Sequence, residues 1–240
     1  MNSSIPRIGF DRFIQLDWAV SVLDIRAGRA DLGNLNALLD TAGLGMAARK
    51  KTRTVLNRLW LEPRPELADF SNRGVSIYKM NPDISIPVVN WGMAIASYPF
   101  FGKVAELVGR LSSLQGDCAS AEVHRRMSEI YGEREGTYRM TNMVLQSQAS
   151  WGAIERVEKG KRLIRLPPLV LTNDQMIAWL VEAALRYSGK ALSVAMLQSL
   201  PVLFPFTLSR PLAYAVSNCH ALELRSEGPN NQFVALRSSI

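Results

Sequence analysis

The residues of this sequence that are best suited to chemistry lie on a helix predicted over residues 135–150. A helical trace places Arg139, Asn142 and Gln146 on one side of that helix. Arginine can form paired hydrogen bonds with the edge of guanine, and asparagine and glutamine can do so with adenine. This side of the helix is therefore suited to contact bases. The other, more core-like side carries Met140, Val144, Ser147 and Trp151.

Candidate phosphate contacts lie just before and just after that side of the helix. Arg134 and Thr137, near the start of the helix, could hold phosphates. After the helix, residues 153–166 predict a hairpin whose Lys-Gly-Lys turn contains Gly160, a residue that can adopt the positive φ of a tight turn. Cations spaced along such a ribbon can neutralise several phosphates. Those of the hairpin are Arg156, Lys159, Lys161, Arg162 and Arg165.

The elements that position these residues follow one another in an informative order. An apolar helix begins after Lys103, a break follows at residues 115–117, and a second helix runs from near Ser120 to Gly132. The helix at 135–150 and the hairpin come next. Three helices followed by a two-stranded ribbon are the winged-helix arrangement, in which the third helix can enter the major groove and the wing can lie along the phosphate backbone. We therefore predict a winged helix at about residues 100–167.

A winged helix can also serve as an adaptor that packs against a protein partner. Acidic residues in this segment dilute its positive field and favour that alternative; they are Glu133, Glu135, Glu155 and Glu158. The base-contacting residue types favour nucleic acid, and DNA over RNA. Two hypotheses follow: a non-enzymatic protein that binds double-stranded DNA, or a scaffold subunit whose winged helix docks a protein partner. A homo-oligomer is left open.

The densest basic cluster of the sequence lies on a helix predicted over about residues 46–60. Its apolar residues face the core, while Arg49, Lys50, Lys51, Arg53 and Arg58 supply five positive charges and no acid. The whole chain carries a formal net charge of +7, and a positive surface concentrates polyanions such as nucleic acid. We expect this helix to assist DNA binding.

The periodicity of apolar residues predicts a mainly α-helical fold with helical-bundle regions, the winged helix and one or two short β-hairpins. Three regions are expected. Residues 1–65 form an N-terminal helical region with the basic helix, and its first helix starts with the spacing of Phe10 and Ile14. Residues 66–168 contain an apolar helix and the winged helix. Residues 169–240 form a C-terminal helical region that ends in a hairpin.

Within the C-terminal region, helices are predicted at residues 176–187, 192–203 and 212–216, followed by hairpin strands at 222–225 and 232–237. This order repeats that of the winged helix more weakly. It leaves two alternatives open: a second, degenerate winged helix, or a hairpin that closes the edge of the domain.

The cellular compartment is predicted from cysteine usage and hydropathy. Cys118 and Cys219 are the only cysteines, too few for the disulfide framework of a small secreted domain, so a reducing, cytoplasmic location is expected. Residues 1–6 predict a short flexible leader. Two uncharged stretches, 84–102 and 191–209, approach membrane-spanning length, but prolines interrupt both, and we predict buried core segments with no membrane insertion.

Other chemistry has weak support in the sequence. His124 and His220 with the two cysteines could make a zinc site, but their spacing lacks a compact ligand pair. Glu129, Glu133 and Glu135 are more typical of a solvated helix end than of a metal site. The sequence contains no phosphate-binding glycine loop or nucleophile motif. We therefore predict no enzymatic activity, no cofactor and no metal.

A pattern of aromatic and hydrophobic positions resembles the small helical BrxA proteins of bacterial BREX phage-defence systems. It comprises Trp91-Gly92-Met93, Tyr98-Pro99-Phe100-Phe101, Val144-Leu145 and Trp151-Gly152-Ala153-Ile154. The resemblance covers roughly residues 10–165. It implies a bacterial cytoplasmic DNA-binding component of a multi-protein defence system with no catalytic residues. The longer C-terminal region departs from the family pattern.

Overall fold

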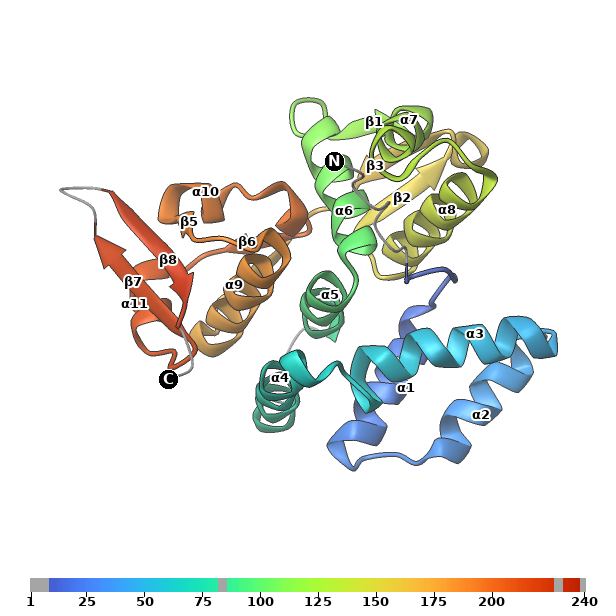
Figure 1. Ribbon diagram of the computed structural model, residues 1–240, viewed down its shortest axis with the longest axis horizontal. Coiled ribbons are helices and arrows are strands. Elements are labelled where there is room, and N and C mark those ends of the chain that lie inside the picture. Colours follow the sequence, from blue (N-terminus) through green and yellow to red (C-terminus); the bar gives the residue numbers. More distant parts are fainter. Residues whose placement is uncertain (1–8, 82–85, 227–230, 238–240) are drawn as a thin grey trace, which may run out of the picture.

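The computed structural model describes residues 9–81, 86–226 and 231–237 (Figure 1). Within these ranges most residues lie in helices, and the strands form three small sheets of two or three strands. The predicted mainly α-helical fold is confirmed. The leader predicted at residues 1–6 lies outside the described residues.

The chain begins with three helices: α1 (Leu16–Ala27), α2 (Leu32–Thr41) and α3 (Met46–Leu56). The carboxylate of Asp31 caps α2 by accepting hydrogen bonds from the backbone N–H groups of Gly33 at 2.7 Å and Asn34 at 3.2 Å. The basic helix is shorter than predicted, because α3 gives way to a π-helical turn at Asn57–Leu61.

The first helix also begins later than the apolar spacing predicted. Residues 9–15 are not helical, although Phe10 and Ile14 are fully buried. Two backbone N–H groups that a helix would have used bind α8 (Glu135–Ser150) instead: Ile14 donates to the Ser147 hydroxyl at 2.8 Å and Leu16 to that of Ser150 at 3.1 Å. Contacts with distant residues thus decide the conformation of this segment.

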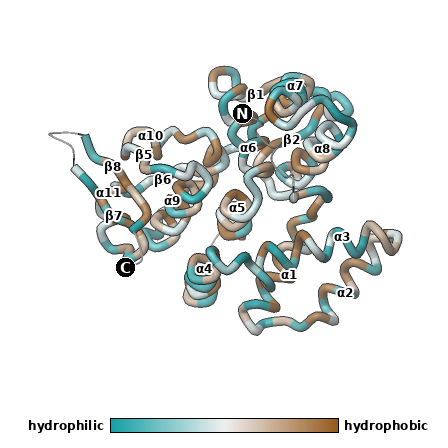
Figure 2. The backbone as a smooth tube through the Cα atoms, viewed as in Figure 1, coloured by the Kyte–Doolittle hydropathy of each residue, from teal (hydrophilic) through white to brown (hydrophobic). Residues whose placement is uncertain are grey.

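The middle of the chain forms a 3₁₀ turn (Pro65–Leu67) and the helices α4 (Ala68–Met80), α5 (Ile86–Ser97) and α6 (Pro99–Leu111). Pro99 separates α5 from α6, since proline cannot donate a hydrogen bond within a helix but suits its first position. Most of α5 is buried, and its tube is largely white and brown in Figure 2, which marks neutral and hydrophobic residues.

Trp179 is the central packing residue of these helices. It lies on α9 (Asp174–Ser188) and stacks on Phe70, with ring centroids 4.5 Å apart. Its indole N–H donates to the backbone oxygen of Phe70 at 2.9 Å. The ring presses against Gly74 of α4 and Gly92 of α5, where an added Cβ would lie 2.7 Å and 2.3 Å from the indole. α9 can pack this closely only because both positions lack a side chain.

The α6–β3 unit, residues 99–165, has a compact order of elements. After α6 come β1 (Asp117–Ala119), α7 (Ser120–Tyr131), α8, β2 (Ile154–Val157) and β3 (Arg162–Arg165). The three strands form an antiparallel sheet in the order β1-β3-β2. The predicted helices and hairpin are present. The three-residue strand β1 was not predicted, because it is recognisable only through its pairing with β3.

The α9–β8 unit, residues 174–236, repeats that order with a 3₁₀ turn and a further strand, β6, inserted between its second and third helices. After α9 come β5 (Leu192–Ser193), α10 (Val194–Gln198), a 3₁₀ turn (Pro201–Leu203), β6 (Phe206–Leu208), α11 (Leu212–Ser217), β7 (Leu222–Ser226) and β8 (Gln232–Leu236). β5, β8 and β7 form an antiparallel sheet with β8 in the middle, as β3 is in the first unit. The predicted hairpin is confirmed; its turn, residues 227–230, lies outside the described residues.

One prediction for this unit is wrong. Residues 192–203 do not form a single helix, because they divide into β5, α10 and a 3₁₀ turn. The hydroxyl of Ser193 caps α10 by accepting a hydrogen bond from the Met196 N–H, and Pro201 opens the separate turn. Capping and proline chemistry therefore override the apolar periodicity here.

The two units meet along α6. Strand β4 (Leu169–Leu171) pairs in parallel with β6, and α6 packs against the turn at Pro201–Leu203. Trp91 of α5 donates its indole N–H to the Val202 carbonyl at 2.9 Å. Buried apolar residues from all three predicted regions belong to one hydrophobic cluster, so these regions share a core.

None of the described helices has both the length and the apolar character needed to cross a bilayer. From Ile86 onward the first uncharged stretch forms α5 and the start of α6, and the second forms β5, α10, the following turn and β6.

The contact between α6 and the Pro201–Leu203 turn should be sensitive to one methyl group. A Cβ at Gly109 would lie 2.1 Å from the Pro201 carbonyl oxygen, and backbone cannot move aside as a flexible side chain can. We expect Gly109→Ala to lower the free energy of unfolding by about 1–3 kcal/mol in urea denaturation. Gly136→Ala is the matched control, because open space surrounds Gly136 in α8, and it should be neutral or stabilising. Equal effects of both variants would contradict this packing.

Candidate nucleic-acid interface

Helix α8 is amphipathic in the way that the sequence predicted. Met140, Val144, Ser147 and Trp151 are buried. Arg139 is exposed, and its side chain has no hydrogen-bond or ion-pair partner among the described residues. Gln146 is partly exposed and lies next to the stretch where residues 14–16 bind α8. The exposed part of α8 is therefore its first half, with Arg139 at its centre.

Asn142 is not free to contact a base in this conformation. Its side-chain oxygen accepts a hydrogen bond of 2.7 Å from Nη2 of Arg156, which reaches over from β2. Burial lowers the pKa of Arg156. The pair ties the hairpin to α8, so both residues position the unit, and Asn142 retains its amide N–H groups for other contacts.

The turn of the hairpin carries two exposed lysines. Glu158, Lys159 and Gly160 all have positive φ, at 52°, 57° and 83°. The sequence predicted this conformation for Gly160 only. Lys159 and Lys161 are exposed and have no side-chain partner among the described residues. They are the free cations of the hairpin.

The other two arginines of the hairpin bind protein groups. Nε of Arg162 donates to Asp117 of β1 at 2.6 Å, and a guanidinium nitrogen lies 3.8 Å from Glu158. Arg165 donates to the Phe204 carbonyl at 2.9 Å and its guanidinium lies 5.3 Å from the centre of that ring. Arg165 thus joins the two units, and only part of the predicted cationic ribbon faces solvent.

The predicted phosphate contact at Thr137 is wrong. Its side chain is 0% exposed, and its hydroxyl lies 3.4 Å from Nε of Arg134 and 3.5 Å from the Tyr131 carbonyl. The hydroxyl connects the end of α7 to the start of α8. Arg134 itself is exposed and remains available.

The basic cluster on α3 lies apart from the α6–β3 unit, since α3 packs against α1 and the π-helical turn. Arg49 pairs with Asp40 of α2. Lys50 and Lys51 are exposed, and Arg53 is half-buried. Arg49, Lys50 and Arg53 line a shallow groove with Met46, Thr54 and Asn57.

His124 makes a structural contact that the sequence did not indicate. The imidazole of His124 on α7 stacks on Tyr138 of α8, with ring centroids 4.0 Å apart. Burial and the charge of Arg156 lower the pKa of His124 to about 4. Its Nδ1 is buried without a hydrogen-bond partner among the described residues. The stack supports Tyr138, whose side chain is exposed beside Arg139.

The residues considered for zinc are divided between the two units. Cys118 and His124 belong to the α6–β3 unit, whereas Cys219 and His220 follow α11. Among the residues that the structure describes, no group of three His, Cys, Asp or Glu side chains could hold a metal ion. Burial, with the nearby Asp117 carboxylate, raises the pKa of the Cys118 thiol to about 11.

Comparisons with known proteins do not assign a family. No family model matches the sequence, and no curated protein or solved structure is significantly similar to it. The resemblance to BrxA proteins therefore stays a prediction.

Protonation of His124 should destabilise the protein at acid pH. The pKa of about 4 in the folded state lies below the value of about 6.5 for an unfolded histidine, so the unfolded chain binds the proton first as the pH falls. Stability is then lost between about pH 6.5 and 4, by less than about 1.4 kcal/mol per pH unit. Urea denaturation of the wild type and His124→Phe across this range measures the effect. If the two proteins differ in free energy of unfolding by the same amount at every pH, this role of His124 is contradicted.

Proposed function

We propose that this chain is a non-enzymatic protein that binds double-stranded DNA through its α6–β3 unit, acting as a winged helix. One observation supports this above the others: the helix, strand, two helices and hairpin are joined by an antiparallel sheet in the order β1-β3-β2. In that arrangement α8 is the helix that enters the major groove and the turn between β2 and β3 is the wing.

The free side chains are suited to two kinds of contact. Arg139 is exposed on α8 and can bind guanine through two hydrogen bonds, with Gln146 about two turns further on. Lys159 and Lys161 at the wing, with Arg134, supply sequence-independent phosphate contacts. Arg156, Arg162 and Arg165 maintain the geometry of the wing through their contacts with protein groups.

The basic helix α3 is proposed as an auxiliary electrostatic surface. Lys50 and Lys51 are exposed, and the whole chain carries a formal net charge of +7, which attracts polyanions. Because such contacts do not depend on base sequence, α3 would add affinity without specificity.

The alternative function, a scaffold whose winged helix docks a protein, has its own observation. On α7 the cations are neutralised: Arg125 and Arg126 both pair with Glu122, and Arg125 also pairs with Glu129. Ile130 and Tyr138 are exposed nearby. A neutral surface with exposed apolar groups suits a protein partner. Membership of a multi-protein bacterial defence or DNA-transaction complex is compatible with either function.

Loss of a wing lysine should weaken binding to every duplex. We expect Lys161→Ala to make the slope of log affinity against log salt concentration shallower by about 1, because one fewer phosphate is neutralised. Fluorescence anisotropy with a random labelled duplex across a salt titration measures this. Lys190→Ala, an exposed lysine of the α9–β8 unit, is the matched control and should leave the slope unchanged. If both variants and the wild type have the same salt slope, the wing is not part of the DNA interface.

Loss of Arg139 should affect base recognition. Once a preferred sequence has been selected from a random pool, Arg139→Ala should weaken binding to it by about 1–3 kcal/mol and relax one position of the preference. Arg225→Ala is the control, since Arg225 pairs with Glu223 on another hairpin. An unchanged preference would exclude the proposed role of α8.

The two functions are separated by one purification experiment. DNA retained at low salt and released as salt rises supports DNA binding. A stable protein partner at high salt, with no DNA retained at low salt, supports the scaffold instead.

A further inference from the structure

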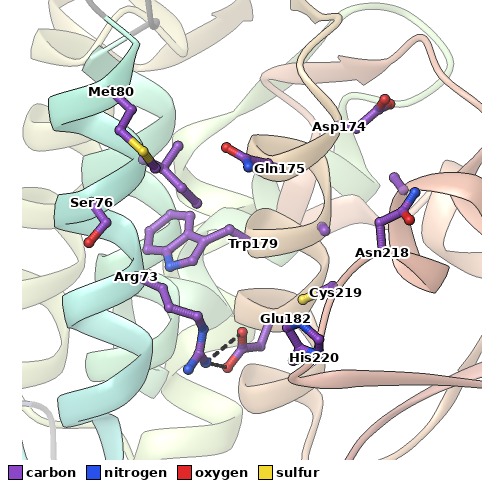
Figure 3. Close-up of a pocket in the computed structure, with 13 residues that line it drawn as sticks. Arg73, Ser76, Met80, Asp174, Gln175, Trp179, Glu182, Asn218, Cys219 and His220 are labelled. Atoms are coloured by element: carbon purple, nitrogen blue, oxygen red, sulfur yellow. Dashed lines mark hydrogen bonds and ion pairs between the residues drawn. The ribbon is translucent and has the colours of Figure 1, made fainter.

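A cavity of about 250 Å³ opens between α4 on one side and α9 with the end of α11 on the other (Figure 3). It lies outside the α6–β3 unit and has no part in the DNA contacts proposed above. Residues that are distant in sequence form its two walls, 73–80 from α4 and 174–220 from the α9–β8 unit. Its shape therefore exists only in the folded chain.

The interior of the cavity is mainly apolar. Ile77, Ala178 and Ala215 form its buried surface together with an edge of Trp179. Two sulfur atoms face it from opposite walls, those of Met80 and Cys219 (Figure 3). Sulfur makes favourable contacts with aromatic rings, and the unbranched Met80, which is 63% exposed, can adjust to a ligand.

One end of the cavity carries an excess of positive charge. Glu182 is 0% exposed, and its carboxylate accepts hydrogen bonds from Nη2 of Arg73 at 2.6 Å and from Nε of Arg186 at 2.9 Å. Two guanidinium groups thus share one carboxylate, which leaves one positive charge. Both hydrogen bonds of Arg73 to Glu182 use Nη2, and its Nη1 binds no described residue.

Other charged groups of the lining do not cancel that excess. Asp174 is engaged by Arg210, whose Nε lies 3.3 Å from its carboxylate. The rest of the polar rim comprises the uncharged Ser76, Gln175 and Asn218 and the imidazole of His220, so it adds no further carboxylate. A small anion with an apolar body therefore matches both ends of the cavity.

We propose that this cavity binds a small aromatic monocarboxylate, with the ring between Met80, Trp179 and Cys219 and the carboxylate toward Arg73. The size agrees, because an apolar cavity of about 150 Å³ holds benzene and this cavity has room for one further polar group. A bound ligand would bridge α4 and the α9–β8 unit and so stabilise the folded chain.

The test uses benzoate as the probe and benzamide as its uncharged counterpart. The full-length protein carries ¹³C-labelled methionine and isoleucine methyl groups, so that Met80 and Ile77 report on the cavity by NMR. We expect saturable shifts of these two methyl signals with benzoate, smaller shifts with benzamide, and a rise in the melting temperature with benzoate alone.

Two exposed positions of α4 give matched variants that spare the core. Ser76→Trp places an indole at the rim of the cavity and should abolish the shifts, whereas Lys79→Trp, outside the lining, should not. Arg73→Gln should remove the preference for benzoate over benzamide. Melting curves establish that each variant is folded.

The results either support or overturn the site. Benzoate shifts that vanish in Ser76→Trp and persist in Lys79→Trp support it. No saturable shift up to about 10 mM, equal binding of benzoate and benzamide, or equal binding by both tryptophan variants would overturn it. DNA binding by these variants is measured in parallel, and its loss or retention bears on the α6–β3 unit alone.

Discussion

The packing of Trp179 is the constraint on which most of the architecture depends. Its ring lies on Phe70, is 6.5 Å from the ring of Trp60, and touches the backbone of α4 and α5 where Gly74 and Gly92 leave space. A single side chain of α9 therefore fixes α4, α5 and the end of the N-terminal helices relative to the α9–β8 unit. Because the indole N–H is satisfied by the Phe70 carbonyl, burial of this large residue leaves its polar group paired.

The same residue relates the two sites proposed above. Trp179 lines the cavity beside α4, while α5 continues through Pro99 into α6, the first helix of the α6–β3 unit. The elements that carry the proposed DNA-binding surface and the cavity thus share one hydrophobic core. Each proposed site uses a different feature: exposed cations on α8 and on the turn between β2 and β3, and a buried carboxylate paired with arginine beside apolar walls.

Internal pairing determines which of the many cations are available. Arg156, Arg162 and Arg165 bind Asn142, Asp117 and Phe204, and Arg49 binds Asp40. A guanidinium group presents several donors in a plane, so arginine is the residue that proteins use for such fixed contacts. Lys159 and Lys161 of the turn between β2 and β3 remain exposed, as expected for a compact and strongly hydrated charge. Counting basic residues therefore overestimates the surface that can neutralise phosphate.

The two units show how the same order of elements can carry different surfaces. In the α6–β3 unit the helix before the hairpin, α8, is long and exposes Arg139 and Tyr138. In the α9–β8 unit the corresponding helix α11 spans only Leu212–Ser217, and the arginines nearby, Arg210 and Arg225, are ion-paired. Helix α11 itself carries no cation, and the unit instead contributes a wall of the cavity.

Elements with local signals could be predicted from the sequence. The bounds of α7 and α8 and the hairpin with Gly160 follow from periodicity and turn chemistry within a few residues. The exposed position of Arg139 and the buried one of Val144 follow from the same helical period.

The remaining features could not be predicted, because they depend on contacts between residues that are distant in sequence. Strand β1 forms only by pairing with β3, and Thr137 is buried between α7 and α8. Arg165 donates a hydrogen bond to the Phe204 carbonyl. Glu182 pairs with Arg73, which lies 109 positions away in the sequence. Which of several polar side chains pair with one another depends on the packing of whole elements, and no local pattern encodes that choice.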